Sequence, residues 1–165
     1  MALEIERRFL VRQKDLPPLG RGKRIDQGYL SATPEVRIRV VDDTSAVVTI
    51  KSDGGMTREE YEYAIPVDDA RRMLRLTPWS VVSKTRYKLP LDGLTWEIDQ
   101  YYGDNDGLWS AEVEVESEEA AAAVTLPPWL ALEVTDQRRF NNVSLAQVPF
   151  SGWPDADHFR SVLSS

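Results

Sequence analysis

The sequence predicts an antiparallel α+β fold, and three observations point to it. Apolar residues recur at every second position through most of the chain, which is typical of strands that bury one face. The alternating segments are short and are separated by clusters of Gly, Pro, Asn and Asp, which favour turns. Helical spacing occurs only in connections and near the C-terminus. This arrangement favours antiparallel strands with helices between or after some of them.

Eight segments have the pattern of strands, and each ends near turn-forming residues. Eight antiparallel strands can close into a barrel, which would leave no unpaired edge. The expected strands cover residues 3–11, 26–31, 36–42, 46–52, 58–65, 81–89, 94–101 and 111–117.

Four short helices are expected in the remaining sequence. Each begins at Ser, Thr or Asp, which can cap free backbone N–H groups. We expect one domain over residues 1–165, with the barrel at about 3–117 and helical and C-terminal segments at 118–165. The helices run from Asp68 or Asp69 to Leu76, from Ser117 to Pro127-Pro128, from Thr135 or Asp136 through Phe140, and from Asp155 to Leu163.

The composition limits the chemistry that the chain can support. Its 165 residues include 27 acidic and 20 basic side chains, which gives a formal net charge of −7. A domain of this length can bury a core without covalent or metal crosslinks. Because Cys is absent, disulfides, thiolate zinc sites, iron–sulfur clusters and a cysteine nucleophile are excluded. With His158 as the one histidine, a Ser-His-Asp triad is disfavoured and any metal must be held by oxygen.

The sequence also indicates a cytoplasmic protein without a membrane or nucleic-acid partner. No apolar run approaches the roughly 18 residues that cross a bilayer. The N-terminal residues lack a basic stretch followed by an apolar core, so we expect no signal peptide. A net negative chain is a poor partner for nucleic acid, although local basic clusters can bind a small polyanion.

Charged residues alternate with apolar ones in nearly every expected strand, and their sign differs between strands. From Asp92 to Glu119 there are ten acidic residues and no Lys or Arg, so these side chains would repel one another if they clustered without a cation. The acidic strands carry Glu4 and Glu6, Glu97 and Asp99, and Glu112, Glu114 and Glu116, whereas the basic strands carry Arg37 and Arg39, and Lys84, Arg86 and Lys88.

Two interpretations of these charged faces remain open. They are either the solvent-exposed faces of an amphipathic sheet or the inner face of one barrel. On an inner face, clustered carboxylates would bind a hard cation such as Mg²⁺ or Mn²⁺. The Arg and Lys side chains would bind phosphate. Together they would bind a metal-complexed polyphosphate.

The order of these motifs resembles that of the CYTH superfamily, the triphosphate tunnel metalloenzymes. The first motif, Glu4-Ile5-Glu6-Arg7-Arg8, is similar to the family signature ExExK. The similarity runs from about residue 3 to residue 146. The further motifs, in the family's order, are Gly28-Tyr29-Leu30, Arg37-Ile38-Arg39, Thr49-Ile50-Lys51-Ser52, Arg58-Glu59-Glu60-Tyr61-Glu62, Lys84-Thr85-Arg86-Tyr87, Glu97-Ile98-Asp99, Glu112-Val113-Glu114 and Glu133-Val134-Thr135.

The resemblance implies an eight-stranded antiparallel β-barrel that forms a triphosphate tunnel with flanking helices, so the polar faces would point inward. The residues implied to hold divalent cations are Glu4, Glu6, Asp99, Glu112 and Glu114, with Asp99 acting directly or through water. Those implied to contact phosphate are Arg8, Arg37, Arg39, Lys51, Lys84, Arg86 and either Arg138 or Arg139. Glu60 and Glu62 would orient the basic side chains, and the catalytic group would be Glu4, Glu6 and Lys84.

Two positions depart from the family pattern. Arg8 replaces the usual lysine, which keeps the charge but presents a wider planar group to phosphate. After the Arg-aromatic pair the chain has Asn141-Asn142-Val143, where small bacterial relatives tend to have lysines. We therefore expect weaker closure over the tunnel mouth.

The activity implied by the resemblance is metal-dependent hydrolysis of inorganic tripolyphosphate by a monomer or homodimer. Glu4 and Glu6, or a second metal that they bind, would orient the attacking water. The alternatives are an adenylate cyclase, a nucleoside or thiamine triphosphatase, and a non-catalytic polyphosphate-binding module. The acidic residues argue against the last, because a pure anion binder gains nothing from them.

Overall fold

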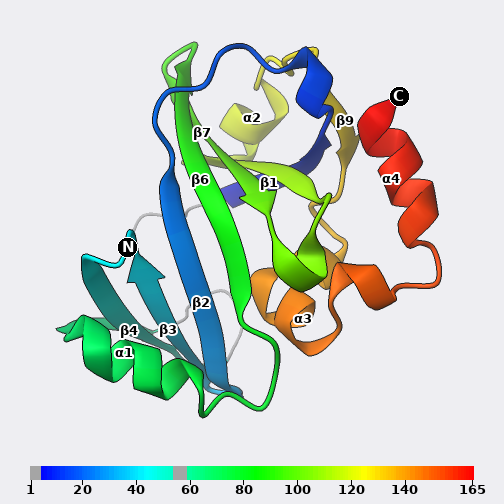
Figure 1. Ribbon diagram of the computed structural model, residues 1–165. Helices are drawn as coiled ribbons and strands as arrows, with labels where there is room; N and C mark the ends of the chain where they lie inside the picture. The colour runs from blue at the N-terminus through cyan, green and yellow to red at the C-terminus, as the bar shows by residue number, and fades with distance from the viewer. Residues whose placement is uncertain (1–4, 54–58) are drawn as a thin grey trace.

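The computed structural model describes residues 5–53 and 59–165, which form one antiparallel sheet with helices around it (Figure 1). The nine strands are arranged in the order β5-β4-β3-β2-β6-β7-β8-β1-β9. Their bounds are β1 (Ile5–Val11), β2 (Lys23–Ala32), β3 (Glu35–Val41), β4 (Ser45–Lys51), β5 (Glu60–Ile65), β6 (Val82–Leu91), β7 (Leu94–Tyr101), β8 (Trp109–Val115) and β9 (Leu130–Glu133).

The predicted fold class is confirmed, whereas the predicted strand count and closure need correction. All eight expected strands form, and β9 is added as a ninth that pairs with β1. Among the described residues, no strand pairing joins β5 to the other end of the sheet. The reason lies at β1, where β9 occupies the edge that a closing strand would need. The sequence did not predict β9, because its four residues follow two prolines and are too few to show alternation of apolar and polar residues.

The helices lie in the connections between the expected strands and after them, and one helix was not predicted. In α2, Ser117 caps the helix as predicted, because its Oγ accepts a hydrogen bond from the Ala120 N–H at 3.0 Å. In α1, however, Pro66 is the first flanking residue, and Asp68 and Asp69 fall inside the first turn. The unpredicted helix is α3, and the segment expected as a helix before it shortens to a 3₁₀ turn at Arg138–Phe140. The helices are α1 (Val67–Leu74), α2 (Glu118–Ala122), α3 (Asn142–Gln147) and α4 (Ala156–Ser164).

Apolar clusters cover the outer side of the sheet. The helix α1 lies across β2, β3 and β4 (Figure 1) and buries Ala70 and Leu74 against Ile38 and Val40. Its close approach requires a glycine at position 28, because a Cβ there would lie 2.8 Å from Thr77 Cγ2 and 2.9 Å from Leu74 Cδ2. A second cluster joins Phe9, Trp96, Ile98 and Trp129.

A third apolar cluster fills one end of the inner side of the sheet. Leu10, Tyr29, Val82 and Tyr101 come from four strands and pack with Phe140 and residues of α3 and α4. The next inner positions are the charged residues Arg8, Lys84 and Asp99 on β1, β6 and β7, and Gln27 on β2. The inner face therefore changes from apolar to charged as it leaves α3.

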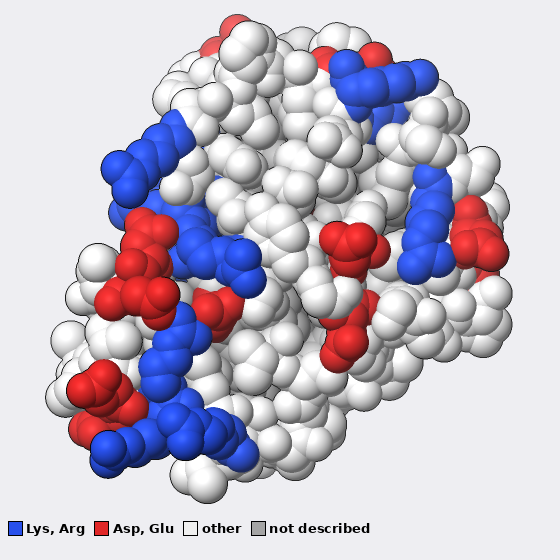
Figure 2. Space-filling view, in the orientation of Figure 1, with Lys and Arg blue, Asp and Glu red and all other residues white. Residues whose placement is uncertain are grey.

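The outer surface in Figure 2 carries mixed charge. Basic and acidic side chains lie next to one another over β2, β3, β4 and α1. The middle of the face in this view is largely uncharged. The sorting of charge by strand is thus not a property of this outer face. Among the described residues, no helix is long and apolar enough to span a bilayer.

Candidate functional site

The inner face of the sheet forms a charged cavity of about 610 Å³. Side chains from β1 through β8 line it, together with Asn141, Asn142 and Val143 at the start of α3. This placement decides between the two interpretations of the alternating charge in favour of the inner face. The site residues expected from the sequence that line the cavity are Glu6, Arg8, Arg37, Arg39, Lys51, Glu60, Arg86, Glu112 and Glu114.

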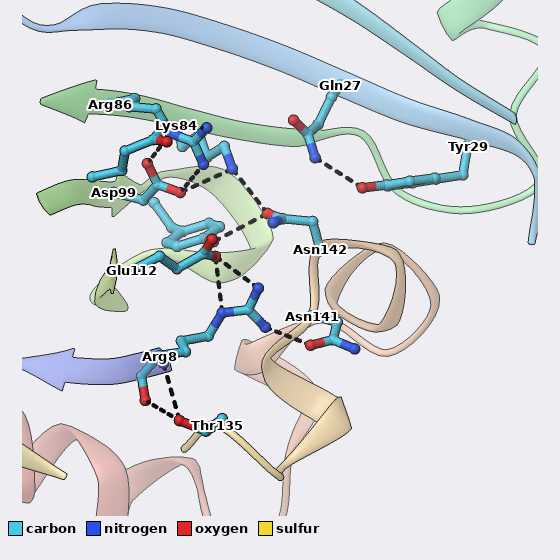
Figure 3. A network of polar contacts seen from close by, with 12 residues as sticks. Arg8, Gln27, Tyr29, Lys84, Arg86, Asp99, Glu112, Thr135, Asn141 and Asn142 are labelled. Carbon is cyan, nitrogen blue, oxygen red and sulfur yellow. Dashed lines mark hydrogen bonds and ion pairs between the residues drawn. The ribbon is translucent and has the colours of Figure 1, made fainter. Parts of the chain in front are cut away.

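A buried ion cluster supports the basic side of the cavity (Figure 3). Asp99 lies opposite Arg86 on the neighbouring strand and accepts hydrogen bonds from its Nε and terminal nitrogen at 2.8 and 2.9 Å. It also accepts one from Lys84 Nζ at 2.9 Å, and the side chains of Lys84 and Asp99 are 0% and 2% exposed. Lys84 and Asp99 therefore lie behind the cavity wall and fix Arg86, which lines it.

The pKa values of both buried groups, Asp99 and Lys84, are shifted by burial and by the charges in this cluster. Burial alone would raise the pKa of Asp99, but Lys84 and Arg86 outweigh burial and hold that pKa well below its usual value. Burial lowers the pKa of Lys84, and Asp99 offsets only part of that effect. Asp99 thus serves two cations, and Glu97 also pairs with Arg86 at 2.8 Å, so each cation of the cluster has a carboxylate partner.

Two further arginines present unused hydrogen-bonding capacity. Arg39 donates from Nε to Gln27 Oε1 at 3.0 Å, and its pKa falls to about 10 because of burial and then the charges of Arg37 and Arg86. Arg37 donates to Thr49 Oγ1 at 3.3 Å. Its Nε, although buried, has no hydrogen-bond partner among the described residues. Three adjacent guanidinium groups and one orphaned donor fit a bound phosphate chain.

The opposite side of the cavity is acidic. Glu6 on β1 lies directly across from Glu114 on β8, and Glu97 on β7 lies across from Glu112. The Glu6 side chain is exposed to the cavity, but nearby protein atoms remove part of its hydration. This loss of hydration raises its pKa to about 7, together with the negative charges of Glu112 and Glu114. Like charges facing one another across a strand pair destabilise the sheet unless a cation neutralises them.

These carboxylates suit a divalent cation whose remaining ligands come from the substrate. Among residues 5–53 and 59–165, no three acidic side chains converge tightly enough to form a ready-made metal site. Mg²⁺ is commonly held by one or two carboxylates together with phosphate oxygens and water. Glu6 and Glu114 can supply the carboxylates of such a site. Glu4, which the sequence placed with them, lies outside the described residues.

Two asparagines that the sequence noted only as departures hold cations of the site (Figure 3). Asn141 Oδ1 accepts a hydrogen bond from Arg8, whose guanidinium also donates to Glu112 Oε1 at 2.7 and 2.9 Å. Asn142 Oδ1 accepts from Lys84 Nζ at 3.1 Å and from the Tyr101 hydroxyl at 3.0 Å. The start of α3 is thereby fastened to both sides of the cavity.

Gln27 and Tyr29 were also missed as parts of the site. Gln27 Nε2 donates to the Tyr29 hydroxyl at 2.9 Å while its Oε1 accepts from Arg39. Their spacing of two along an expected strand, on the face that carries the charged side chains of its neighbours, was the signal that could have found them.

The remaining expected residues do not join the cavity. Arg138 is exposed, and Arg139 forms hydrogen bonds to Asp155 at 2.9 and 3.0 Å. The Arg139 guanidinium also lies 4.5 Å from the ring centre of Trp153, so it belongs to the packing around α4. Glu62 is exposed beside the cavity, with Thr49 as its neighbour across the strands.

Replacing Asn142 with alanine is expected to lower the free energy of unfolding by about 1–3 kcal/mol, because the buried Lys84 and Tyr101 each lose an acceptor. Urea unfolding measures the change. Gln147→Ala is the matched control, since Gln147 is exposed on the same helix. Equal stability of the Asn142 variant and the unmodified protein would show that this contact does not fasten α3.

Inorganic triphosphatases are similar to this chain in sequence and in fold. An inorganic triphosphatase of Acetivibrio thermocellus is 35% identical over 158 residues, which cover 94% of this chain and 100% of the relative. An inorganic triphosphatase of Nitrosomonas europaea is 40% identical over 147 residues, covering 87% and 96% of the two chains. The crystal structure of the inorganic triphosphatase NE1496 superposes with a TM-score of 0.72 at 37% identity, covering 88% of this chain and 95% of that one.

The family assignment rests on a match over most of the chain. The model of the CYTH domain matches residues 2–139, a range that contains all eight strands from β1 through β8 and β9 as well. Since this match spans far more than half of the sequence, and both relatives exceed 30% identity, the chain belongs to the CYTH domain family.

Proposed function

We propose that this protein hydrolyses inorganic tripolyphosphate with Mg²⁺ or Mn²⁺ as cofactor. The observation that carries the proposal is one cavity with a basic side and an acidic side. A metal-complexed polyphosphate needs both, because its oxygens require cations and its metal requires anionic ligands. The names of the two relatives, both inorganic triphosphatases, agree with this substrate.

The basic residues bind the phosphate chain and hold it in place. Arg37 offers its unpaired Nε, while Asp99 and Gln27 hold Arg86 and Arg39 in fixed orientations. Hydrolysis of a phosphoanhydride depends mainly on positioning and on neutralising the charge that grows on the leaving oxygen. Preorganised guanidinium groups supply both effects. The proposed phosphate-binding residues are Arg8, Arg37, Arg39, Lys51 and Arg86, with Lys84 acting through Asp99 and Asn142.

The acidic residues hold the metal and the attacking water. When bound, the ion neutralises phosphate oxygens next to the scissile bond. Glu6, Glu112 and Glu114 would hold it together with Glu4, whereas Asp99 would act by fixing Arg86, because both of its oxygens already accept hydrogen bonds.

Glu4 and Glu6 also orient the attacking water in this proposal. A carboxylate facing that water can accept its proton as the new bond to phosphorus forms and the bridging oxygen leaves. Glu60 lies opposite Lys51 in the β4–β5 register and would orient it, with Glu62 as its neighbour on the same strand face.

Phosphate release tests the proposed function directly. Tripolyphosphate, pyrophosphate, thiamine triphosphate and ATP are each supplied with Mg²⁺, with Mn²⁺ or with EDTA, and cyclic AMP is measured in parallel. We expect the highest kcat/KM for tripolyphosphate and loss of activity in EDTA. Preferred use of ATP, or accumulation of cyclic AMP, would reject the proposal in favour of a nucleotide-directed enzyme. A cytoplasmic location and a monomer or homodimer remain predictions.

Replacing Glu114 with glutamine is expected to raise the Mg²⁺ concentration for half-maximal activity roughly tenfold or more, since changes even behind metal ligands cost about 10–100-fold in affinity or activity. Stability should stay equal or rise slightly, because a like charge opposite Glu6 is removed.

Glu116→Gln is the matched control for this change, because Glu116 follows two residues later and is exposed just beyond the end of β8. Metal titrations of phosphate release compare the two variants. An unchanged Mg²⁺ dependence in the Glu114 variant would remove Glu114 from the metal site.

A further inference from the structure

The side chain of Tyr29 is buried in the wall of the charged cavity, where its hydroxyl accepts a hydrogen bond from Gln27 (Figure 3). We propose that this hydroxyl donates a hydrogen bond to an oxygen of the bound polyphosphate, and that Gln27 sets the direction of that bond. This inference rests on the proposed function and adds an uncharged donor to its basic side. Tyr29 would be a substrate-binding residue and Gln27 a positioning residue.

Tyr29 and Gln27 occupy successive inner positions of β2. In the β2–β3 register, Tyr29 lies across from Arg37 and Gln27 lies across from Arg39. Tyr29 and both arginines line the cavity of about 610 Å³. The tyrosine ring belongs to the apolar cluster that fills one end of the inner side of the sheet. Its hydroxyl therefore lies at the boundary between apolar and charged side chains, next to two of the proposed phosphate-binding residues.

The orientation of the Gln27 amide is fixed by Arg39, because a guanidinium group can only donate hydrogen bonds. Arg39 Nε donates to Gln27 Oε1 at 3.0 Å, so the amide oxygen faces Arg39. The amide nitrogen then faces Tyr29 and donates to its hydroxyl oxygen at 2.9 Å. Because Tyr29 is the acceptor in this bond, its own proton points elsewhere.

The hydroxyl proton of Tyr29 has no acceptor among residues 5–53 and 59–165, where the hydroxyl bonds only to the Gln27 amide nitrogen. Tyr101, the other buried tyrosine of the same cluster, differs because its hydroxyl donates to Asn142 Oδ1 at 3.0 Å. Burial raises the pKa of Tyr29 to about 12, although nearby arginines favour the ionised form. At neutral pH the hydroxyl therefore keeps its proton and remains a donor.

An anionic oxygen in the cavity is the acceptor that fits this donor. The buried Nε of Arg37, directly across from Tyr29, also has no partner within the described parts of the chain. Two unused donors on facing residues can bind oxygens of one phosphate or of adjacent phosphates. The competing acceptor is Glu35, which lines the same cavity but lies across from Lys51 on β4 and forms no hydrogen bond to Tyr29.

Replacing Tyr29 with phenylalanine removes the hydroxyl and leaves the ring in the apolar cluster. We expect the Kd for tripolyphosphate, measured by calorimetric titration in EDTA, to rise about tenfold to a hundredfold, the range for a hydrogen bond to a charged group. The value of kcat/KM in Mg²⁺ should fall by at least as much. Tyr63→Phe is the matched control, since Tyr63 is 57% exposed and lies three residues from Glu60, on the other face of β5.

Replacing Gln27 with glutamate tests the direction of the bond. A carboxylate still accepts from Arg39, but it also accepts from Tyr29, so the hydroxyl proton turns toward it and away from the substrate. The added negative charge weakens anion binding by itself, and the same substitution in the Tyr29→Phe protein measures that part. We expect Gln27→Glu to raise the Kd by a factor about tenfold smaller in the Tyr29→Phe protein than in the unmodified one.

The outcomes separate this inference from the proposed function. If the unmodified protein binds tripolyphosphate without cleaving it, and Tyr29→Phe binds it more weakly, the proposed function fails and the hydrogen bond stands. If the unmodified protein cleaves tripolyphosphate and Tyr29→Phe has the same Kd and kcat/KM, the proposed function stands and the inference is overturned. Equal factors for Gln27→Glu in both proteins also overturn it. Absence of tripolyphosphate binding by the unmodified protein overturns both.

Discussion

Replacing Arg37 with alanine is expected to lower kcat/KM for tripolyphosphate by about 10²–10³-fold, the usual cost of removing one preorganised donor from a site of developing charge. The buried Nε of Arg37 has no partner among the described residues, although buried donors are normally satisfied. The substrate is the acceptor that we propose for it. Part of the loss should fall on kcat, because the charge of the phosphate chain grows at the leaving oxygen in the transition state.

Steady-state phosphate release measures this loss, and unfolding experiments show whether the variant remains folded. Stability should be unchanged or slightly higher, since the charges of Arg37 and Arg86 both oppose the charged form of Arg39. Arg72→Ala is the matched control, because Arg72 is an exposed arginine on α1. Normal kinetics in the Arg37 variant would mean that the cavity does not hold the substrate phosphates.

Replacing Asp99 with alanine is expected to lower the free energy of unfolding by about 3–5 kcal/mol, the range for breaking a buried ion pair by removing one partner. Asp99 is 2% exposed and accepts hydrogen bonds from both Lys84 and Arg86. Its removal leaves Lys84, which is 0% exposed, without a carboxylate, while Arg86 keeps only Glu97 as its partner.

Tripolyphosphate should restore part of this stability, because a ligand that binds only the folded state stabilises it by mass action. Guanidinium unfolding with and without the ligand measures both effects. Asp136→Ala is the control, since Asp136 is exposed in a turn. If the Asp99 variant were as stable as that control, the buried cluster would not be what holds Arg86 in position.

The predicted elements that proved reliable depend on local patterns. In β3 and β8, charged residues alternate with apolar ones, and a period of two places each kind on its own side whatever the rest of the chain does. The separation of acidic from basic strands was visible for the same reason. These patterns predicted the antiparallel class and all eight of the main strands, whereas the placement of their charged residues in one cavity was implied by the resemblance to the CYTH superfamily.

Contacts between distant segments explain what the pattern could not predict. The strand β9 exists because β1 offers it an edge, and its own four residues carry little signal. Arg138 and Arg139 come three and two residues before Asn141, which does line the cavity, yet the pairing of Arg139 with Asp155 directs it toward α4. Neither strand edges nor ion-pair partners can be read from residue spacing.

The sequence by itself therefore determined the class of fold, the charge of each strand and the kind of ligand that those charges suit. The tertiary structure decided which charges remain available. Lys84 and Asp99 are 15 residues apart and neutralise one another in the wall, while Asn142, 58 residues from Lys84, completes that cluster. Arg37 keeps a free donor because no side chain of the described strands reaches it. Burial and pairing set the strength of each charge, and both depend on neighbours that only folding brings together.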